Sequence, residues 1–493
     1  MGWDLDNIRR ISIWDDSGRT AWRWILHGID LDMGIAIYLT FMVREMIEPD
    51  IENKTLISSR TLAYQFLWTL PWTNTVLPII TPTLYLWIVD TIALRRGTWV
   101  IESGTKLGWQ IWRGLEIEYV KSSSSTWRKA DSTDREAIFF LVTNMLIVFG
   151  LVAFDNAMAI LNSFPVLFPT VPRLPSPALL VTALLTPTTK YDQQRLDSFL
   201  DALKTLRRKS RSFYLASGVF EGRLRNDLIL LYSFCRTADD LVDTASSEKQ
   251  AHMFISKLRQ FLDASYSRKG HLPLEKVIAS LPESARLALQ QLPTQYISPE
   301  PLYSLLEGFE MDLEFPKSFP IRDQEALELY GTRVAGTVAE LIIELVYYHS
   351  SSQTTLAKQR QIIQAGNTMG VALQLVNIAR DIQVDAKINR VYIPTSWLKE
   401  VNLSPKDIIK NPNRQEVHAL RRKLLDHAMD LYHESKPKIE MLPSEARSSM
   451  RVAVESYMEI GRVLQKPGYK IKAGRATVPT FRRILVAWKA LCV

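Results

Sequence analysis

The chain has 493 residues, of which 47% are hydrophobic and 23% are charged, so its composition excludes a disordered protein and allows two or three domains. Its two cysteines, Cys235 and Cys492, cannot form a disulfide framework, which favours a reducing compartment or a cytosolic face. The net charge of +8 is modest for this length, and no basic tract is dense enough to predict nucleic-acid binding.

The two parts of the chain differ in character. The first part is rich in Trp, Leu, Ile and Pro and contains long apolar runs, whereas the sequence from Tyr191 onward has the pattern of charged, amphipathic helices. A Pro/Thr cluster at residues 186–189 predicts a linker between them. The N-terminus has no apolar h-region, so we expect no secretory signal. We therefore predict two domains, residues 1–187 and 188–493.

The first domain contains candidate membrane helices. Residues 137–161 are long enough to cross a bilayer and hold one charge, Asp155. A second candidate covers residues 77–94 and holds Asp90, whereas residues 164–185 are apolar but interrupted by prolines, as in a re-entrant segment. Buried helices of a large soluble protein are the alternative. The length of the runs and the tryptophans at their flanks favour membrane insertion.

The basic residues predict a topology. They are frequent in residues 95–135, which the positive-inside rule places on the cytosolic side. One crossing at 137–161 would then put the second domain on the opposite side, so a cytosolic second domain requires residues 164–185 to cross again. Within the basic segment, residues 119–135 are polar and Ser-rich and are typical of a flexible loop.

The second domain contains two acidic repeats. Asp239 and Asp243 lie in LYSFCRTADDLVDTA, and Asp381 and Asp385 lie in LQLVNIARDIQVDAKINRVYIP. In a helix, four residues rise by about 6 Å, so both carboxylates of a pair lie on one face. If the two pairs face each other across a cavity, they form a negative site. Mg²⁺ suits such a site, because it keeps some of its water and bridges to substrate phosphates.

The first acidic repeat lies on a polar stripe beside an apolar one. Tyr232, Arg236, Asp239 and Asp243 follow a 4-3-4 spacing, which aligns them along one face of a helix. A solvated face with an Arg–Asp pair has the same spacing, so this helix alone does not decide between surface and site.

The second acidic repeat favours a site. Gln374, Asn377, Asp381 and Asp385 form one stripe that lacks the Lys/Glu pairing of a solvent-facing helix. Amide and carboxylate oxygens are suitable ligands or supports for Mg²⁺ and its water, and Arg380 is placed to contact phosphate oxygens. Because the motif occurs on two separate helices, we predict a metal–diphosphate site, with Asn377 as a further metal-ligand candidate.

Two further segments each allow two interpretations. Ser210 and Arg211 follow the basic residues 207–209 near a helix start, which suits a phosphate cradle or an ordinary N-cap with a basic surface. Residues 330–338, YGTRVAGTV, are rich in small side chains. They either let a long substrate lie against the backbone or allow two helices to pack closely.

Four blocks resemble the motifs of the squalene/phytoene synthase family. They are SRSFYLAS, YSFCRTADDLVD, YGTRVAGTV and LQLVNIARDIQVDAKINRVYIP, and they occur in the family's order within residues 195–490. The resemblance implies an all-α isoprenoid-synthase fold with a central cavity. It also implies head-to-head condensation of two prenyl diphosphates through a cyclopropyl intermediate, which for geranylgeranyl diphosphate is prephytoene diphosphate.

The resemblance also implies roles for matching residues. It assigns Mg²⁺ or Mn²⁺ to Asp239, Asp243, Asp381 and Asp385, and diphosphate oxygens to Ser210, Arg211, Arg236 and Arg380. It gives Gln374 and Asn377 a supporting role and lines the site with Tyr232 and Tyr330. Metal ions and cationic side chains would stabilise the departing diphosphate, while apolar walls would keep water from a carbocation. Such an enzyme is expected to face the cytosol, which completes the expectation of a multi-pass membrane protein.

The first domain resembles the membrane lycopene cyclase domain of fungal bifunctional lycopene cyclase/phytoene synthases. The resemblance lies in PTLYLWIVDTIALRRGTWVIESGTKLG and LVTNMLIVFGLVAFDNAMAIL. It implies acid-initiated cyclisation of lycopene ends to β-rings, giving γ- and β-carotene without a metal. A carboxylic acid in an apolar membrane site is a suitable proton donor, because burial disfavours its ionisation.

This domain departs from the family pattern in two places. The family has two related halves, and we identify only the second one here, since residues 6–60 do not match. The acidic motif of that half reads Glu116 and Glu118 and resumes at Glu136, so residues 119–135 interrupt it. We hypothesise a retained intron or misjoined exons, which puts the cyclase activity, but not the synthase activity, in question.

The leading function is therefore phytoene formation from two geranylgeranyl diphosphates beside a membrane domain that acts on lycopene. The alternatives are a squalene or dehydrosqualene synthase with a shorter substrate, and a non-catalytic, synthase-like assembly factor. Fusion to a cyclase-like domain disfavours the first alternative. The intact acidic pairs disfavour the second, because such a factor has no need of metal ligands.

Overall fold

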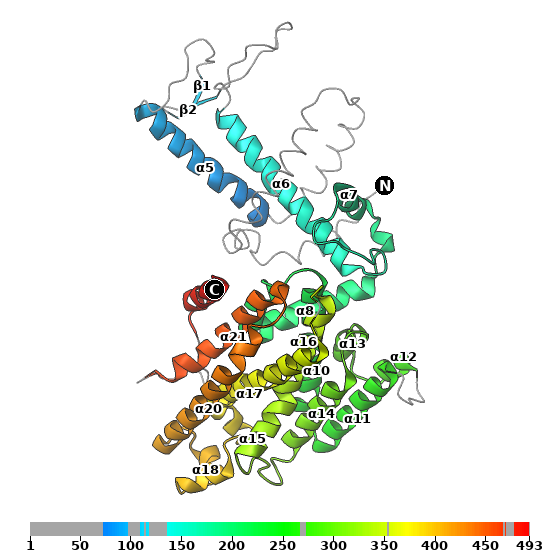
Figure 1. The fold of residues 1–493 in the computed structure, drawn as a ribbon, viewed down its shortest axis with the longest axis vertical. Coiled ribbons are helices and arrows are strands. Elements are labelled where there is room, and N and C mark those ends of the chain that lie inside the picture. The colour runs from blue at the N-terminus through cyan, green and yellow to red at the C-terminus, as the bar shows by residue number, and fades with distance from the viewer. Residues whose placement is uncertain are drawn as a thin grey trace. The chain divides into compact units, whose positions relative to one another are not determined.

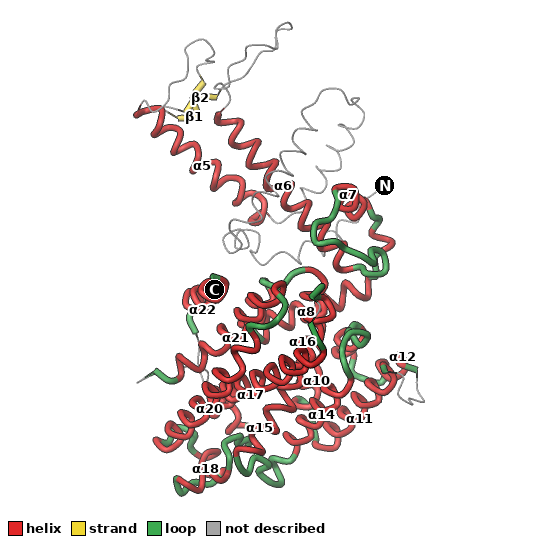
Figure 2. Tube along the Cα trace, in the orientation of Figure 1, coloured by secondary structure: helices red, strands yellow, loops and turns green. Residues whose placement is uncertain are grey.

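The computed structural model describes residues 72–96, 109–112, 115–117, 136–266, 273–352, 354–466, 469 and 478–492. These residues are nearly all helical, as the sequence predicted, apart from one short hairpin (Figures 1 and 2). Residues 6–60, Glu118 and residues 119–135, to which we assigned the departures from the family pattern, lie outside the described residues.

The chain divides into two compact units, Met1–Tyr191 (unit 1) and Asp192–Val493 (unit 2). The division falls a few residues after the boundary that the Pro/Thr cluster suggested. Thr188–Lys190 forms a 3-10 turn, and the ring of Tyr191 stacks on Phe164 with 4.5 Å between the centroids. This contact holds the turn against unit 1, so the Pro/Thr cluster is part of unit 1 and not a free linker.

Unit 1 contains two long helices, α5 (Trp72–Arg96) and α6 (Glu136–Ser163), which pack against each other. The Nδ2 atom of Asn144 on α6 donates to the Oγ1 atom of Thr83 on α5 at 2.9 Å. A polar bond of this kind joins helices in an apolar environment. The antiparallel strands β1 (Trp109–Trp112) and β2 (Leu115–Ile117) lie between the helices in the chain, and β2 contacts both of them.

One helix in the described part of the chain is long and apolar enough to cross a membrane. It is the stretch Thr143–Ser163 of α6, with a mean hydropathy of 1.8. The apolar stretch of α5 is shorter, Leu77–Val89. The predicted second crossing at residues 164–185 contains only the nine-residue helix α7 (Pro177–Leu185), which at 1.5 Å per residue is far shorter than a bilayer core of about 30 Å. The prolines before it end the helical pattern, so this segment forms no second spanning helix.

Unit 2 is a bundle of helices (Figures 1 and 2). Its longest helix is α17 (Leu356–Lys387), which packs against α20 (Gln415–Ile439), α16 (Thr337–His349) and α21 (Ser444–Leu464). The other elements are α8 (Gln193–Lys209), α9 (Arg211–Ser217), α10 (Gly222–Asp243), α11 (Glu248–Ser265), α12 (Leu274–Ala279), α13 (Glu283–Gln290), α14 (Pro299–Leu313), α15 (Gln324–Gly331), η2 (Thr332–Gly336), α18 (Thr395–Glu400), α19 (Pro405–Lys410) and α22 (Thr480–Leu491). The described residues of unit 2 form a large apolar core and a smaller apolar cluster between α9, α21 and α22.

The ends of these helices follow capping chemistry. The side chains of Asp192, Ser247 and Asp323 each accept the backbone N–H three residues later and so begin α8, α11 and α15. At the end of α17, Asn389 takes a left-handed φ of 60°. The N–H of Arg390 then bonds the carbonyl of Asp385 at 2.9 Å. This Schellman-type turn ends the longest helix beside its acidic pair and turns the chain back toward α10.

The small-residue segment 330–338 packs closely against a neighbouring helix. It contains η2, a π-helical turn between α15 and α16. A Cβ atom on Gly370 of α17 would lie 2.6 Å from the carbonyl oxygen of Ala335, and one on Gly336 would lie 2.5 Å from the Oδ1 atom of Asn367. The glycines therefore permit the close approach of η2 and α17, which was one of the two interpretations of this segment.

Candidate functional site

Unit 2 contains a cavity of about 980 Å³. It is lined by parts of α8 to α10, α14 to α17, η2 and α20 to α22, so helices that are far apart in the sequence contribute to one space. The predicted site residues that line it are Ser210, Tyr232, Arg236, Asp239, Asp243, Tyr330, Gln374, Asn377, Arg380, Asp381 and Asp385. The side chain of Arg211 lies outside the described part of the structure.

Both acidic pairs lie in the last turns of their helices, since α10 ends at Asp243 and α17 ends two residues after Asp385. The carboxyl end of a helix carries partial negative charge, which adds to the negative charge of the carboxylates at this end of the cavity. Burial and the neighbouring Asp243 raise the pKa of Asp239 to about 7. Burial and the neighbouring Asp381 raise the pKa of Asp385 to about 8. This end of the cavity is therefore a place where bound cations relieve an electrostatic cost.

Cationic side chains flank the first acidic pair. The Nη1 atom of Arg236 lies 3.0 Å from the Oδ2 atom of Asp239, and its Nη2 atom contacts Asp240. The Nζ atom of Lys209, at the end of α8, lies 2.9 Å from the Oδ2 atom of Asp240. Asp240 thus holds two cationic groups at the cavity wall, where both Lys209 and Arg236 are among the lining residues.

The two acidic helices are joined by Arg390, a residue to which the sequence analysis gave no role. Its Nη2 atom lies 2.9 Å from the Oδ1 atom of Asp243, and its Nη1 atom lies 3.9 Å from the Oδ2 atom of Asp312. These carboxylates and burial act in opposite directions on the guanidinium, and the net effect raises the pKa of Arg390 above its usual value. The pair Arg390–Asp243 fixes the carboxyl end of α10 next to the end of α17.

Asp312 on α14 is a second residue that the sequence analysis missed. Its Oδ1 atom accepts the hydroxyl of Tyr392 at 2.8 Å, and its Oδ2 atom accepts the hydroxyl of Tyr330 at 3.2 Å. The two tyrosine rings stack with 5.0 Å between their centroids. Burial raises the pKa of Asp312 to about 6 although Arg390 and both hydroxyls favour its charged form. Tyr330, predicted to line the site, is therefore held in place by a buried carboxylate.

The second acidic helix carries its own polar contacts. Arg380 forms a two-point contact with the adjacent Asp381, including 2.9 Å from its Nε atom to Oδ1. The Nδ2 atom of Asn377 donates a hydrogen bond to the Oε1 atom of Gln374 at 3.2 Å. The hydroxyl of Tyr457 on α21 donates to the Oδ1 atom of Asn377. The amide stripe that was predicted from the sequence is thus a connected network at the cavity wall.

The segment at residue 210 has a capping role in the structure. The Oγ atom of Ser210 accepts the backbone N–H of Phe213 at 3.3 Å and begins α9. This is the N-cap interpretation that the sequence left open. Ser210 also lines the cavity near Lys209, so its hydroxyl lies beside a cationic group. Its proposed contact with a diphosphate stays a prediction.

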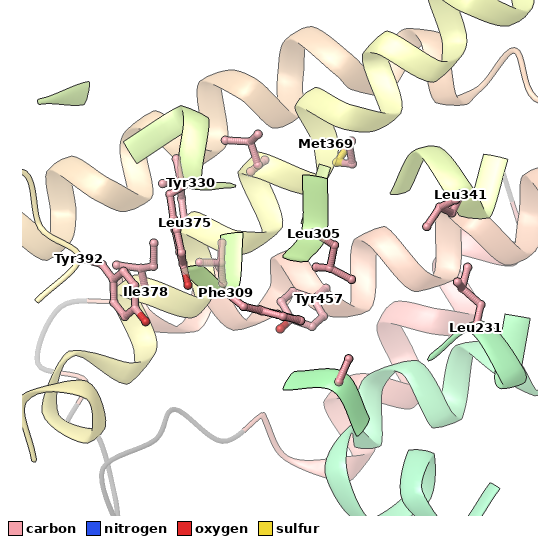
Figure 3. Close-up of a cluster of buried hydrophobic side chains, with 14 of the residues drawn as sticks. Leu231, Leu305, Phe309, Tyr330, Leu341, Met369, Leu375, Ile378, Tyr392 and Tyr457 are labelled. Carbon is pink, nitrogen blue, oxygen red and sulfur yellow. The ribbon is translucent and has the colours of Figure 1, made fainter. Parts of the chain in front are cut away.

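Most of the other side chains that line the cavity are apolar. Figure 3 shows Tyr330 and Tyr392 at one end of the buried cluster and Leu231 at the other, with Phe309 and Tyr457 between them. Along α10, the lining residue Leu228 precedes Asp243 by roughly 20 Å at 1.5 Å per residue. The cavity is therefore polar and charged where α10 and α17 end and apolar farther along both helices. Its shape and chemistry suit an amphiphile with an anionic head and a long hydrocarbon chain.

The donor set fits a divalent cation that retains other ligands. In the described part of the chain, no group of three His, Cys, Asp or Glu side chains could hold a metal ion by itself. The two acidic pairs on α10 and α17 instead supply hard oxygen atoms from two sides of one cavity. Mg²⁺ is commonly bound in this way, with one or two carboxylates, water and substrate phosphate oxygens. A closed structural zinc site would require nitrogen or sulfur ligands that are absent from this set.

The cyclase candidates lie in unit 1. Glu116 is the central residue of β2, and Glu136 is the first residue of α6. The contact between β2 and α6 brings these two elements together although the insert separates them in the chain.

Comparisons with known proteins agree with this geometry. The sequence model of the family described as squalene/phytoene synthase matches residues 206–482. A bifunctional lycopene cyclase/phytoene synthase of Leptosphaeria maculans is 54% identical over 433 residues, covering 87% of this chain and 72% of that protein. The protein of the same description from Pyrenophora tritici-repentis is 52% identical over 475 residues, covering 96% of this chain and 76% of that protein.

A further relative with this description, from Neurospora crassa, is 46% identical over 459 residues, covering 88% of this chain and 73% of that protein. Among solved structures, a dehydrosqualene synthase in complex with a ligand is 22% identical with a TM-score of 0.49 and covers 60% of this chain and 96% of that chain.

Proposed function

The chain belongs to the squalene/phytoene synthase family, and we propose that unit 2 joins two molecules of geranylgeranyl diphosphate head to head to form phytoene. It is a prenyltransferase-type enzyme of carotenoid biosynthesis, like the bifunctional lycopene cyclase/phytoene synthases to which it is similar. The relatives that share half of its sequence are bifunctional lycopene cyclase/phytoene synthases, which favours phytoene over the shorter squalene-type products.

The observation that carries this proposal is the single cavity of unit 2. Two acidic pairs and the cationic groups Lys209, Arg236, Arg380 and Arg390 line its charged part, and apolar side chains line the rest. A prenyl diphosphate has the same division between a highly charged head and a hydrocarbon chain. The charged part would hold the diphosphates, and the apolar part would hold the chains and exclude water.

We propose that the side chains act in two groups. Condensation requires an allylic C–O bond to break, with the diphosphate leaving with the electron pair. Arg236, Arg380 and Lys209 would exchange their present carboxylate contacts, in part, for diphosphate oxygens and so stabilise the leaving group. The double bond of the second molecule would add to the resulting carbocation, and loss of a proton would close the cyclopropyl ring of prephytoene diphosphate. That intermediate would then lose its own diphosphate, rearrange and lose a proton to give phytoene. The apolar wall, including Phe309, would keep water away from the carbocation in both steps.

Enzymes of this family generally use divalent metal ions, and we propose Mg²⁺, or Mn²⁺ in its place. Asp239, Asp243, Asp381 and Asp385 would hold the ions, with Asn377 as a further ligand. Bound metal would supply positive charge that neutralises the diphosphate as it leaves. The raised pKa values of Asp239 and Asp385 support this assignment, because a nearby cation favours the ionised carboxylates.

For unit 1 we propose lycopene β-cyclisation. The matched 433 residues of the Leptosphaeria maculans protein extend well beyond unit 2, so the similarity includes part of unit 1. Glu116, Glu118 and Glu136 are the candidates for the acid that protonates lycopene. The apolar stretch Thr143–Ser163 supports a membrane location for this unit. Unit 2 would lie on the cytosolic side, where prenyl diphosphates with their water-soluble head groups would be available.

The proposal is tested by product analysis of the purified full chain with Mg²⁺. We expect phytoene from geranylgeranyl diphosphate and much less product from farnesyl diphosphate. Squalene or dehydrosqualene as the main product would replace the proposal with the shorter-substrate alternative. Absence of any condensation product, with correctly folded protein and both substrates supplied, would favour a non-catalytic assembly role.

A further inference from the structure

The last helix of unit 2 is fixed in a defined orientation. α22 (Thr480–Leu491) buries Ala487 and Ala490 against Ala216 of α9 and Val452 of α21. The Nη1 atom of Arg451 donates to the carbonyl oxygen of Ala490 at 2.9 Å, and Arg482 contacts the buried Glu459. Small alanines allow the close packing, and the two arginines hold the helix at both of its ends. The outward face of α22 is therefore set by these contacts.

That outward face is apolar. Phe481, Leu485 and Trp488 follow the i, i+4, i+7 spacing of one helical face. Their side chains are 76%, 41% and 42% exposed, respectively. The other exposed large apolar residues that the structure describes in unit 2 are not aligned on a single helix in this way. We call these three residues the α22 stripe.

The charge around the α22 stripe is positive. Every charged side chain that follows Glu459 in the sequence is Lys or Arg. Lys489 is exposed next to Trp488, whereas Arg482 is paired with Glu459 and Arg483 lines the cavity. A helix with an apolar face, basic flanks and a tryptophan is typical of a segment that lies in the interface of an anionic bilayer. This positive charge favours an anionic surface over a neutral or basic apolar partner.

The α22 stripe also lies on a helix that contributes to the cavity wall. Arg483 on α22 and Val478, which precedes the helix, both line the cavity. Within the described residues, moreover, α6 is long and apolar enough to cross a bilayer. A membrane anchored by unit 1 would be present at high effective concentration near unit 2, because both belong to one chain.

From these observations we propose that the α22 stripe docks unit 2 onto the surface of an anionic lipid bilayer. The apolar side chains enter the interface between headgroups and acyl chains, and the exposed Lys489 contacts anionic headgroups. Docking would bring a wall of the apolar cavity close to the phase in which prenyl chains dissolve. That consequence rests on the proposed synthase function, whereas the docking itself does not.

The test measures contact between lipid and a label in the α22 stripe. The full chain carries Cys492→Ser to remove the exposed thiol and Leu485→Cys to accept a fluorophore. Burial raises the pKa of the Cys235 thiol to about 12, which keeps it unreactive. The protein is reconstituted in vesicles of phosphatidylcholine and phosphatidylserine that contain headgroup-level spin-labelled lipid. We expect the fluorescence at residue 485 to fall by at least half.

The matched control labels Met253→Cys on α11, whose side chain is 42% exposed, against 41% for Leu485. α11 and α22 lie on opposite sides of unit 2 in Figure 1, so the label at residue 253 should keep its fluorescence. Equal quenching at residues 253 and 485, or none at either, would overturn the proposal. The second result would mean that water, another part of the chain or a second copy covers the α22 stripe.

A charge-introducing variant separates docking from folding and catalysis. Phe481→Glu combined with Trp488→Glu should abolish quenching at residue 485. Neither residue lines the cavity, so phytoene formation in detergent should stay within twofold of the parent. Unchanged quenching in this variant would overturn the proposal. Quenching of the parent in pure phosphatidylcholine vesicles that equals its quenching in vesicles with phosphatidylserine would overturn the proposed role of anionic headgroups. Loss of phytoene formation by the parent would count against the synthase proposal and leave the lipid contact measured independently.

Discussion

Single residues determine the charge balance of the cavity in unit 2. Asp239, Asp243, Asp381 and Asp385 lie near the carboxyl ends of two helices, and burial raises the pKa of Asp239 and Asp385 above the usual range. Arg236, Arg380 and Arg390 compensate part of this charge through direct contacts. The remaining negative charge is available for metal ions, so the acidic side chains should matter more for activity than for folding.

Replacement of one metal-ligand candidate tests this view. Asp239→Asn or Asp381→Asn should lower phytoene formation at least about 100-fold, because even residues that only support metal ligands often contribute 10- to 100-fold. The measurement is the rate of phytoene formation from geranylgeranyl diphosphate at saturating Mg²⁺. Asp430→Asn on the exposed face of α20 removes the same charge and should leave the rate unchanged. Near-parent activity of both site variants would contradict the metal assignment.

The raised pKa values predict a dependence of stability on pH in the absence of divalent cations. The unfolded chain has ordinary aspartates of pKa 3.8, whereas folding raises the pKa of Asp239 to about 7 and of Asp385 to about 8. The folded state therefore binds more protons than the unfolded one between these values. Their contribution to stability is complete below pH 3.8 and is lost as the pH rises through 7 and 8.

Added Mg²⁺ should reverse this loss. It binds ionised carboxylates, so it should raise the Tm of unit 2 by a few degrees at pH 8 and by less at pH 5. Calorimetry at the two pH values, with and without Mg²⁺, measures the difference. The double variant Asp239→Asn/Asp385→Asn removes both titrating groups and should show a weaker response to Mg²⁺. An equal Mg²⁺ effect at both pH values in the parent would exclude these aspartates as its cause.

Residues that complete the charge balance were not predictable from spacing. Asp239 and Asp243 share one helix, so the local period places them together, and the same holds for the second pair. Asp312 lies on a third helix, and Arg390 lies after the end of α17. Their contacts with Tyr330 and Asp243 depend on how whole helices are arranged, a property for which one sequence has no local signal.

At the scale of secondary-structure elements, close packing of η2 on α17 forms one wall of the cavity. Val334 and Ala335 line the cavity from η2, while Gly336 and Gly370 allow the backbone of η2 to approach α17. The small-residue segment therefore lines the cavity on one side and packs closely against α17 on the other. A π-helical turn is common where a helix contributes to a functional site.

A methyl group at this contact should destabilise unit 2. Gly370→Ala places a Cβ atom 2.6 Å from the carbonyl oxygen of Ala335, which is backbone and cannot rotate away. We expect a loss of about 1–3 kcal/mol in the free energy of unfolding, as for other overpacked sites. Thermal or denaturant unfolding of the purified variant measures it.

The control for this prediction is Gly461→Ala on α21. There, the nearest atom to the new Cβ is a methyl group of Val376 at 3.2 Å, which can shift. Both positions lie inside helices and gain the same propensity of about 1 kcal/mol from alanine, so their difference isolates the backbone contact. Equal stability of the two variants would show that η2 can move away from α17 without cost.

The membrane element was predictable in part. The apolar run at 137–161 lies within α6, because an uninterrupted apolar pattern without proline forms one long helix. Residues 164–185 were interpreted as a re-entrant segment that would have to cross again if unit 2 is cytosolic, and they form an irregular segment and the short α7. The composition shows an apolar segment long enough to span a bilayer, but its prolines prevent a continuous helix of that length.

At the scale of the whole molecule, the two units are expected to carry separate reactions. Asp381 belongs to unit 2, and Glu136 belongs to unit 1. In a host that supplies lycopene, Asp381→Asn should leave β-ring formation unchanged, and Glu136→Gln should lower it without affecting phytoene formation from geranylgeranyl diphosphate. Product analysis by chromatography measures both activities. Loss of both activities in either single variant would contradict independent sites.

The same assay of β-ring formation tests whether the interruption of the acidic motif lowers the cyclase activity. Deletion of residues 119–135 joins Glu118 directly to Glu136 and should raise β-ring formation above that of the parent chain. Transcripts that read directly from Glu118 to Glu136 would support the hypothesis of a retained intron. A cDNA population that always retains the insert would contradict it.

The sequence by itself determined the helical class of unit 2, the two carboxylate pairs and the family, because these depend on local period and on motifs of adjacent residues. The tertiary structure decided that both pairs and an apolar wall line one cavity, that Arg390 joins α10 to α17, and that α22 turns an apolar stripe outward. Each of these features depends on contacts between segments that are distant in the chain. Helical periodicity orients a side chain about its own helix, but only packing determines which helix lies opposite.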